Sequence, residues 1–476
     1  MNYWLIIVGV IYLGTLITLS YTSFKKTKTA EDYILGGSNF GFIIGMLTFA
    51  ATLFSTFTFM GMPDFFRNHG IGSWIFLAVS DAIMFFGIIW FGTKLRAKTK
   101  TLNYQGISGM LIKLYKNPWA GYIYVIGAFC FLIPYVSIQI QGVSIFLTAM
   151  FPTAMPSWGW SLSIVVIMIL YSEFGGLRAI VYIDVFQGVL LLVIIWVIAY
   201  GCIVQSGGVG EIIRQVTVQQ PDLMSVPGPK GLFTTQFLIV SMISIVLIPV
   251  TQPQVLTRLI IIKSEKTLRL MSVGLGIFAF TLISATLFIG FYGALNYTGA
   301  SPEDFLAGVL LHEQTDVVAA LVVVGLLAAA TSTADSQLFA LGAEIRSVLL
   351  YHGRSSVNYT RVGILVFGLA SLVFSIISGN QLVLLARVSL TGTALLAPMI
   401  ISAIVRHSPP GKVIVVATGF ALVLFLLSLV AFIPDIIGII RLDLLLLISL
   451  GLTALIEGKL SVGIGKPTGA NKTEEI

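Results

Sequence analysis

Charged side chains are scarce in this chain. Aspartate, glutamate, lysine and arginine make up 10% of its 476 residues, whereas hydrophobic residues make up 57%. An ordinary soluble domain carries about 25% charged residues. The scarcity of charge therefore excludes an ordinary soluble domain and predicts an integral membrane protein that is surrounded by the lipid bilayer.

Cysteine and histidine are also rare. The two cysteines, Cys130 and Cys202, lie within or at the end of apolar segments, so the sequence has neither a disulfide framework nor a metal-ligand spacing. The four histidines fall in loops or at the ends of predicted helices, and they are His69, His312, His352 and His407. Their placement disfavours a histidine proton relay across the membrane. We expect a protein that is not an enzyme and has no catalytic residues.

Long apolar runs are abundant, and thirteen of them approach or exceed the roughly 18 residues needed to cross a bilayer. They lie near residues 3–22, 41–63, 72–93, 118–150, 158–173, 180–203, 234–256, 271–296, 317–347, 361–378, 380–405, 412–432 and 436–456. The first run lacks a basic start and a cleavage motif, so it is interpreted as a retained helix. The fold class expected is an all-α membrane protein with about thirteen transmembrane helices.

The basic residues are distributed unevenly between the two sides of these helices. Most of the 27 lysines and arginines fall in the odd-numbered loops or the tail, whereas Arg67, Arg214 and Lys230 fall in the opposite loops. By the positive-inside rule, the N-terminus lies outside and the C-terminus lies in the cytoplasm. We expect a multi-pass protein of the plasma (inner) membrane that works as a monomer and has no nucleic-acid partner.

Two of the predicted helices are interrupted. The second contains Gly61-Met62-Pro63, and the seventh contains Pro249 and Pro253. Interrupted helices at corresponding positions of two halves indicate an inverted repeat with a binding site between them. The fourth and ninth helices, also five apart, are the two longest. The expected architecture is 1 + (5+5) + 2, with an N-terminal helix and loop at 1–40, repeats at 41–203 and 234–405, a connector at 204–233, two C-terminal helices at 406–460 and a tail at 461–476.

The most informative stretch is residues 328–336, inside the ninth predicted helix. Ala329, Ser332, Thr333 and Ser336 share one helical face, and Asp335 lies on its flank. These oxygen ligands, beside alanines that allow another backbone to come close, indicate a sodium site. The alternative is ordinary close helix packing by small residues.

Four ionisable residues are predicted at membrane depth, where each costs about 2.5 to 3.5 kcal/mol unless it is paired or hydrated. They are Asp81, Asp184, Asp335 and Arg387. Asp184 could pair with Arg178, Asp335 could form a salt bridge or a helix cap, and Asp81 could pair with Arg387. Alternatively, Arg387 offers a fork to a substrate carboxylate, and Asp81 accepts from an ammonium or hydroxyl groups.

Other polar and aromatic residues are candidates for lining a substrate pocket, with ordinary packing as the alternative for each. Together with Asp81 and Arg387, the candidate substrate-binding residues are Phe57, Thr58, Tyr135, Gln139 and Gln252, and Gln141 is compatible with the same pocket.

Several motifs resemble the sodium:solute symporter family, which shares the inverted five-helix fold of the bacterial leucine transporter. The most specific is Tyr171-Ser172-Glu173-Phe174-Gly175-Gly176-Leu177-Arg178-Ala179, followed by Tyr182-Ile183-Asp184-Val185-Phe186-Gln187-Gly188. Gln252-Pro253-Gln254 with Arg258 resembles the inner end of the sixth core helix in proline-type members.

The resemblance implies a sodium site built from carbonyl groups and hydroxyl groups of two helices. Its ligands would be the carbonyls of Ala51, Phe54 and Ala329 and the hydroxyls of Ser332 and Thr333. Some members have a second sodium site nearer the cytoplasm, and here that set would be Asp184, Ser332, Asp335 and Ser336. The chain departs from the family pattern at Asp335, where a hydroxyl residue is usual, and at Leu53, where the proline transporter has an aspartate.

The function expected from these observations is secondary active transport by alternating access. Sodium would drive symport of a small polar organic solute that bears a carboxylate, such as an amino acid, sialic acid, pantothenate or a monocarboxylate. Proton coupling stays an alternative because of Asp335, and a sugar substrate stays one because of Asp81. A transporter-like sensor is disfavoured because no signalling domain follows Leu460.

Overall fold

The computed structural model of this chain describes residues 2–102, 104, 106–354, 356–378, 382–406 and 410–464. Within these ranges the chain is almost entirely helical, and its only sheet is one short antiparallel hairpin. His407 and the part of the predicted tail from residue 465 onward lie outside the described residues.

The helices and strands follow one another along the chain with short connections. In chain order they are α1 (Asn2–Phe24), α2 (Ala30–Leu35), α3 (Phe42–Leu53), η1 (Phe57–Gly61), α4 (Met62–His69), α5 (Ile71–Trp74), η2 (Ile75–Val79), α6 (Ser80–Leu102), α7 (Ile107–Tyr115), α8 (Pro118–Met150), α9 (Ser157–Gln205), α10 (Val209–Gln219), η3 (Pro221–Met224), α11 (Thr235–Val246), α12 (Ile248–Thr251), α13 (Pro253–Ile261), α14 (Glu265–Asn296), α15 (Pro302–Ala307), η4 (Gly308–His312), α16 (Asp316–Tyr351), α17 (Asn358–Ile377), α18 (Leu382–Ala394), α19 (Ala397–Val405), α20 (Val413–Leu429), β1 (Ile436–Ile437), β2 (Ile440–Arg441) and α21 (Leu442–Ile464).

The predicted apolar runs coincide with helices or with consecutive helices. The run predicted at 118–150 is α8, and the run predicted at 317–347 is α16. Seven of the described helices are long and apolar enough to cross a membrane, or nine if each bent pair counts as one span. The all-α membrane fold is thus confirmed, and the number of thirteen spans stays a prediction.

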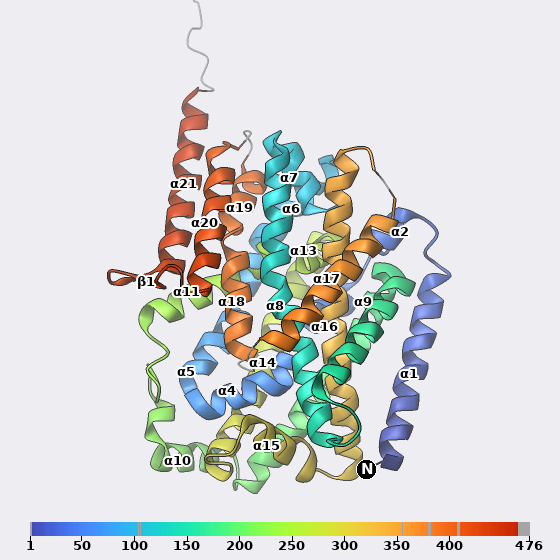
Figure 1. Ribbon diagram of the computed structural model, residues 1–476, viewed down its shortest axis with the longest axis vertical. Coiled ribbons are helices and arrows are strands. Elements are labelled where there is room, and N and C mark those ends of the chain that lie inside the picture. Colours follow the sequence, from blue (N-terminus) through green and yellow to red (C-terminus); the bar gives the residue numbers. More distant parts are fainter. Residues whose placement is uncertain are drawn as a thin grey trace, which may run out of the picture.

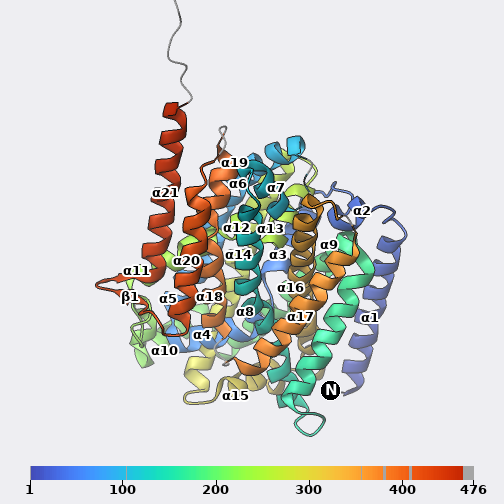
Figure 2. The same cartoon turned by 45° about the horizontal axis from the view of Figure 1, so that its top comes forward.

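The bundle places its N-terminal and C-terminal helices at opposite edges. Figures 1 and 2 show α1 at one edge and α20 with α21 at the other, with α8, α14 and α16 between them. Large apolar side chains on the outer helices are exposed, including Ile17 on α1, Val373 on α17 and Phe420 on α20. This pattern is expected of side chains that face lipid tails.

Three helices bend or break near the middle of the bundle. α3 ends at Leu53, and the chain is bent by 61° before it continues as η1 and α4. α12 ends at Thr251 before α13 begins, and α18 is bent by 40° against α19. The first break was predicted at Gly61-Met62-Pro63 and lies instead at Phe54 to Thr56. Pro63 is the second residue of α4, which follows η1 without a break.

α9 contains two of the predicted spans, joined at Gly176. This glycine has φ 60° and ψ −179°, a conformation that residues with a side chain rarely adopt. A Cβ atom built there would lie 2.8 Å from the ring of Tyr33, so the close approach of α2 also requires glycine. Gly176 belongs to the motif at 171–179 that carries the family resemblance. Its backbone conformation explains why that position of the motif is a glycine.

The last predicted helix begins later than expected. Residues 436–441 form the hairpin β1–β2 and α21 starts at Leu442, whereas the prediction placed a helix over 436–456. Gly438 turns the hairpin with φ 63°, and β-branched isoleucines on both sides of it favour extended strands. Arg441, predicted inside a helix, therefore lies at the end of β2.

Candidate functional site

The middle of α16 meets the broken end of α3. The hydroxyl groups of Ser332 and Thr333 both donate to the carbonyl oxygen of Ala51, each at 3.1 Å. Ser332 also lies 3.1 Å from the carbonyl oxygen of Ala329, one turn earlier on α16. Four oxygen atoms from two helices therefore converge at one point in the interior.

These oxygen atoms form a chemically suitable set for a sodium ion. Ala51, Ala329, Ser332 and Thr333 are all at least 98% buried, and hydroxyl and carbonyl oxygens are the ligands that hard cations prefer. Phe54 follows α3 directly with an extended backbone, at φ −89° and ψ 123°, so its carbonyl group leaves the helical direction. The structure thus brings together four of the five residues predicted for the first sodium site. The fifth, Phe54, comes shortly after Ala51 in the chain.

Asp184 and Ser336, predicted for a second sodium site, are connected by an arginine. Nη2 of Arg258 lies 3.0 Å from Oδ2 of Asp184 and donates to Oγ of Ser336 at 2.6 Å. Thr48 on α3 donates to the same Asp184 oxygen at 2.7 Å. Asp184 and Arg258 are almost completely buried.

The predicted pairing of Asp184 with Arg178 is wrong, because Asp184 pairs with Arg258 on α13. The position of Arg258 in the apolar segment 253–261 was a signal in the sequence of its burial. A buried guanidinium close to a buried carboxylate avoids the cost of leaving either charge alone.

Asp335 is buried on the flank of α16 that faces the N-terminal helix. Thr331 lies one turn before Asp335 on the same helix. Gln187 on α9 donates to Tyr12 at 2.7 Å and to Thr331 at 3.2 Å. The additional helix α1 therefore joins a polar network with α9 and α16.

Two tyrosines of α8 contact the two helix breaks. Tyr135 donates to the carbonyl oxygen of Leu53, the last residue of α3, and Tyr124 donates to that of Thr251, the last residue of α12, each at 3.1 Å. Carbonyl groups at a helix end lack an intrahelical partner, so these hydroxyl groups satisfy them. α8 thereby connects both breaks.

Several predicted substrate-binding residues gather around these breaks. Thr58 accepts a hydrogen bond from the N–H group of Ser55 at 3.2 Å, and Phe57 is buried in the same turn. Oε1 of Gln139 and Nε2 of Gln252 are buried and have no hydrogen-bond partner in the described part of the chain. Asp81 is buried in the first turn of α6.

Arg387 and Gln141 lie apart from this group. Nη2 of Arg387 pairs with Oδ2 of Asp443 at 2.8 Å, so the predicted pairing with Asp81 is wrong. The reason is tertiary, because α18 directs Arg387 toward α11 and α21. Gln141 donates to the carbonyl oxygen of Ser375 on α17 at 2.9 Å and is held there.

Access to the centre differs between the two ends of the bundle. A cavity of about 620 Å³ opens beside α4 and α15, the end predicted to lie outside, and reaches Met60 and Gly61 next to the first break. At the other end, the space beside Arg258 and Glu344 is only about 10 Å³. Glu344 accepts from the N–H groups of Ile107 and Ser108 at 2.9 and 2.8 Å, which holds the start of α7 against α16.

Known proteins with related sequences are solute transporters. The chain is 25% identical over 353 residues to the sodium/pantothenate symporter of Haemophilus influenzae, covering 71% of this chain and 70% of that protein. It is 24% identical over 339 residues to a high-affinity proline transporter of Bacillus subtilis, covering 68% and 69%.

Solved structures share the same fold. A Na⁺-coupled sialic acid symporter in a substrate-bound outward-open state aligns with TM-score 0.73 and 18% identity over 98% of both chains. The transporter MhsT in complex with L-phenylalanine aligns with TM-score 0.55 and 13% identity, covering 87% of this chain and 98% of the other. The sequence model of the sodium:solute symporter family matches residues 33–334, so this chain belongs to that family.

Proposed function

We propose that this protein takes up a small carboxylate-bearing solute together with one sodium ion bound between α3 and α16. Membership of the family establishes sodium-coupled symport of a small organic solute, and the ion site and the solute class are the finer parts of the proposal. The observation that carries it is the contact of the Ser332 and Thr333 hydroxyl groups with the carbonyl oxygen of Ala51.

The mechanism follows from coordination of one ion by two helices, α3 and α16. A cation between Ala51 on α3 and Thr333 on α16 replaces a direct hydrogen bond by coordination from both helices, so it favours the conformation in which they lie close. Solute binds next to the break while the outer cavity is open. When the repeats 41–203 and 234–405 rock against each other, these helices separate and the ion loses ligands. Ion and solute then leave on the other side.

The electrochemical gradient of sodium sets how far one ion can concentrate the solute. At a membrane potential of about 100 mV and a roughly tenfold gradient, one sodium ion supplies about 3.7 kcal/mol. This supports accumulation of a neutral solute by about 500-fold.

The second sodium ion at Asp184, Ser332, Asp335 and Ser336 stays a prediction. In the described conformation the guanidinium group of Arg258 already contacts Asp184 and Ser336. One coupled ion is therefore the simpler proposal.

The solute class rests on chemistry that the named relatives share. Pantothenate, proline and sialic acid each carry a carboxylate, and these names occur among proteins similar to this chain. Near the break, the N-terminus of η1 supplies the positive end of a helix dipole, which favours a carboxylate. Gln139, Gln252 and Asp81 supply polar groups for the rest of the solute. Arg387 is paired with Asp443 and is not part of this proposed solute site.

Two alternatives have a specific residue in their favour. Proton coupling is supported by the buried carboxyl group of Asp335, and a sugar substrate is supported by the buried carboxyl group of Asp81. We further propose a functional monomer in the plasma (inner) membrane with its N-terminus outside and its C-terminus in the cytoplasm, based on the distribution of basic residues.

The function is tested by uptake into proteoliposomes. Purified protein is first screened for thermal stabilisation by pantothenate, proline, sialic acid, short monocarboxylates and sugars, with and without sodium. The solute that stabilises most is then followed as a radiolabel under a sodium gradient, a proton gradient or neither.

We expect stabilisation by a carboxylate-bearing solute in sodium only, and uptake under the sodium gradient only. Equal uptake under a proton gradient in sodium-free buffer would establish proton coupling instead. Stabilisation by neutral sugars alone would contradict the proposed solute class.

A further inference from the structure

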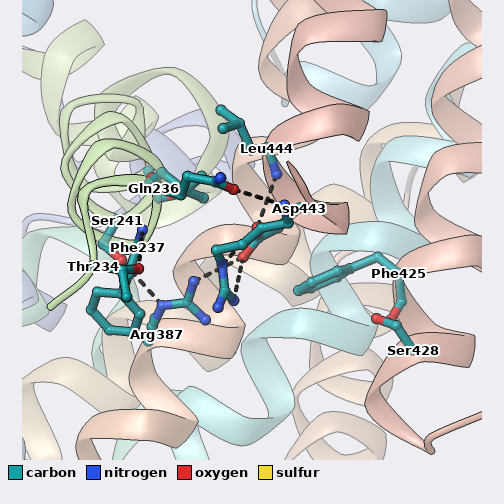
Figure 3. Close-up of polar contacts among 12 residues, drawn as sticks. Thr234, Gln236, Phe237, Ser241, Arg387, Phe425, Ser428, Asp443 and Leu444 are labelled. Carbon is teal, nitrogen blue, oxygen red and sulfur yellow. Dashed lines mark hydrogen bonds and ion pairs between the residues drawn. The ribbon is translucent and has the colours of Figure 1, made fainter. Parts of the chain in front are cut away.

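A group of charged residues lies far from the sodium site, where α11, α18 and α21 meet. Figure 3 shows Arg387 and Asp443 facing each other beside Phe237, Ser241 and Gln236. Arg387 pairs with Oδ2 of Asp443 at 2.8 Å, and Arg441 pairs with the same oxygen at 3.0 Å. We call Arg387, Arg441 and Asp443 the outer cluster.

The outer cluster has one more positive charge than negative charge. Both oxygens of Asp443 are already in use, since Oδ1 accepts from Nε of Arg441 at 3.2 Å and from the N–H group of Leu444 at 2.9 Å. Arg387 uses Nε for Ser241 and Nη2 for Asp443. Both guanidinium groups lie over the ring of Phe237, 4.3 and 5.8 Å from its centroid. In the described part of the chain their Nη1 groups make no hydrogen bond, so donors remain for an anion.

A groove of about 660 Å³ borders these two arginines. Its charged lining is Lys230, Arg387 and Arg441, and no acidic side chain lines it. Its remaining walls include Leu232, Phe237 and isoleucines of the hairpin, with hydroxyl and amide groups from the start of α11. A second cavity of about 400 Å³, on the other side of the outer cluster, is lined by Asp435 and Asp443 as well as by both arginines. The acidic side chains therefore line the second cavity, and Lys230 adds its positive charge to the first groove.

The hairpin beside the groove exposes apolar side chains. Ile439 is 87% exposed, and the exposed large side chains next to it along the chain are Val430, Phe432, Ile436, Ile437 and Ile440. Figures 1 and 2 show the hairpin projecting from the edge of the bundle. Gln236 holds it in place by donating to the carbonyl oxygen of Ile439 and accepting from the N–H group of Arg441. A basic groove thus continues into an apolar surface that is fixed to the protein.

We propose that this groove binds the phosphate group of an anionic phospholipid. Arginine offers a planar pair of donors that matches a phosphate, and Lys230 adds a third positive charge. The acyl chains would lie along the hairpin isoleucines, which is the reason to assign a lipid and not a soluble anion. By the predicted topology, the lipid belongs to the outer leaflet.

The proposal is tested by titrating delipidated protein with phosphatidylglycerol or phosphatidylcholine and counting bound lipids by native mass spectrometry. The test variant is Lys230→Gln/Arg441→Gln, and the matched control is Lys26→Gln/Arg214→Gln, which removes two exposed positive charges elsewhere. Thermal unfolding of each protein shows whether it is folded, and Lys230→Gln alone provides a variant at an exposed position.

We expect the wild type and the control to retain phosphatidylglycerol in preference to phosphatidylcholine, and the test variant to bind it about tenfold more weakly or worse. Equal retention by test variant and control would overturn the proposal. So would stabilisation by inorganic phosphate that equals stabilisation by phosphatidylglycerol and is lost in the test variant, since the groove would then bind a soluble anion. These outcomes are independent of whether sodium drives uptake.

Discussion

Ser332 and Thr333 are neighbours in the chain, and both contact the carbonyl oxygen of Ala51. Successive residues on a helix point about 100° apart, so the two hydroxyl groups can reach one oxygen only if that oxygen lies close to the helix, between them. The alanines at 328–330 permit this approach because they have no side chain beyond Cβ.

Removal of either hydroxyl group should weaken sodium binding. For Ser332→Ala and Thr333→Ala, we expect the sodium concentration for half-maximal uptake to rise by about tenfold to a hundredfold, since each loses an oxygen ligand of a cation. The measurement is uptake at saturating solute over a range of sodium concentrations.

The control for these variants is Thr331→Ala, whose hydroxyl group donates within α16 to Leu327 and does not face Ala51. It should leave the sodium dependence within about twofold of the wild type. Unchanged sodium dependence in both site variants would contradict the proposed ion site.

The position of the Arg258 guanidinium group determines whether one or two bound sodium ions are expected. If its guanidinium group stays between Asp184 and Ser336, the Hill coefficient for sodium in the wild type should be close to one. Arg258→Gln or Asp184→Asn alone leaves a buried charge unpaired and should destabilise the protein by about 3 to 5 kcal/mol. The double variant removes both charges and should recover much of that stability, as measured by thermal unfolding.

A wild-type Hill coefficient close to two that falls to one in Asp184→Asn would show instead that the second sodium ion binds. In that case Arg258 would have to move away from Asp184 during transport.

At the scale of elements, the two helix breaks have nearly the same backbone geometry. Phe54 after α3 has φ −89° and ψ 123°, and Gln252 after α12 has φ −91° and ψ 122°. Each preceding carbonyl group accepts from a tyrosine of α8. The likeness agrees with the predicted inverted repeats, and α8 is the element that connects both breaks.

Tyr135→Phe should disturb the first break and the ion site next to it. The carbonyl oxygen of Leu53 loses its buried donor, which costs about 1 to 3 kcal/mol, and we expect the sodium concentration for half-maximal uptake to rise several-fold. Tyr124→Phe is the matched variant, because it removes the equivalent bond at Thr251, which is no ligand of the proposed ion. Sodium titrations that are the same for both variants would contradict this separation of roles.

At the scale of the whole molecule, access to the centre is unequal at the two ends. The large cavity beside α4 and α15, and the contact of Glu344 with the start of α7 at the other end, describe a molecule that is more open at the end predicted to lie outside. In this state α3 and α16, which form the proposed sodium site, are in contact. The arrangement agrees with an ion that binds before the solute.

The sequence by itself determined the membrane class, the positions of most helices, the family and the oxygen-rich face of α16. The class, the helices and the shared face follow from local composition and periodicity, since a bilayer demands long apolar helices and a helix brings residues three and four apart onto one face. The family follows from the resemblance of the motifs at 171–188 and 252–258. Ala329, Ser332 and Thr333 lie together because they share α16, whereas helix packing brings Ala51 of α3 to them.

Only the tertiary structure decided which charged residues pair. Asp184 takes Arg258 and Arg387 takes Asp443, and each pair joins residues more than 50 positions apart in the chain. A buried charge takes the partner that helix packing brings within reach, and sequence distance does not report that packing. The basic groove beside the hairpin was missed for the same reason, because it exists only where the segments around Lys230, Arg387 and Arg441 come together.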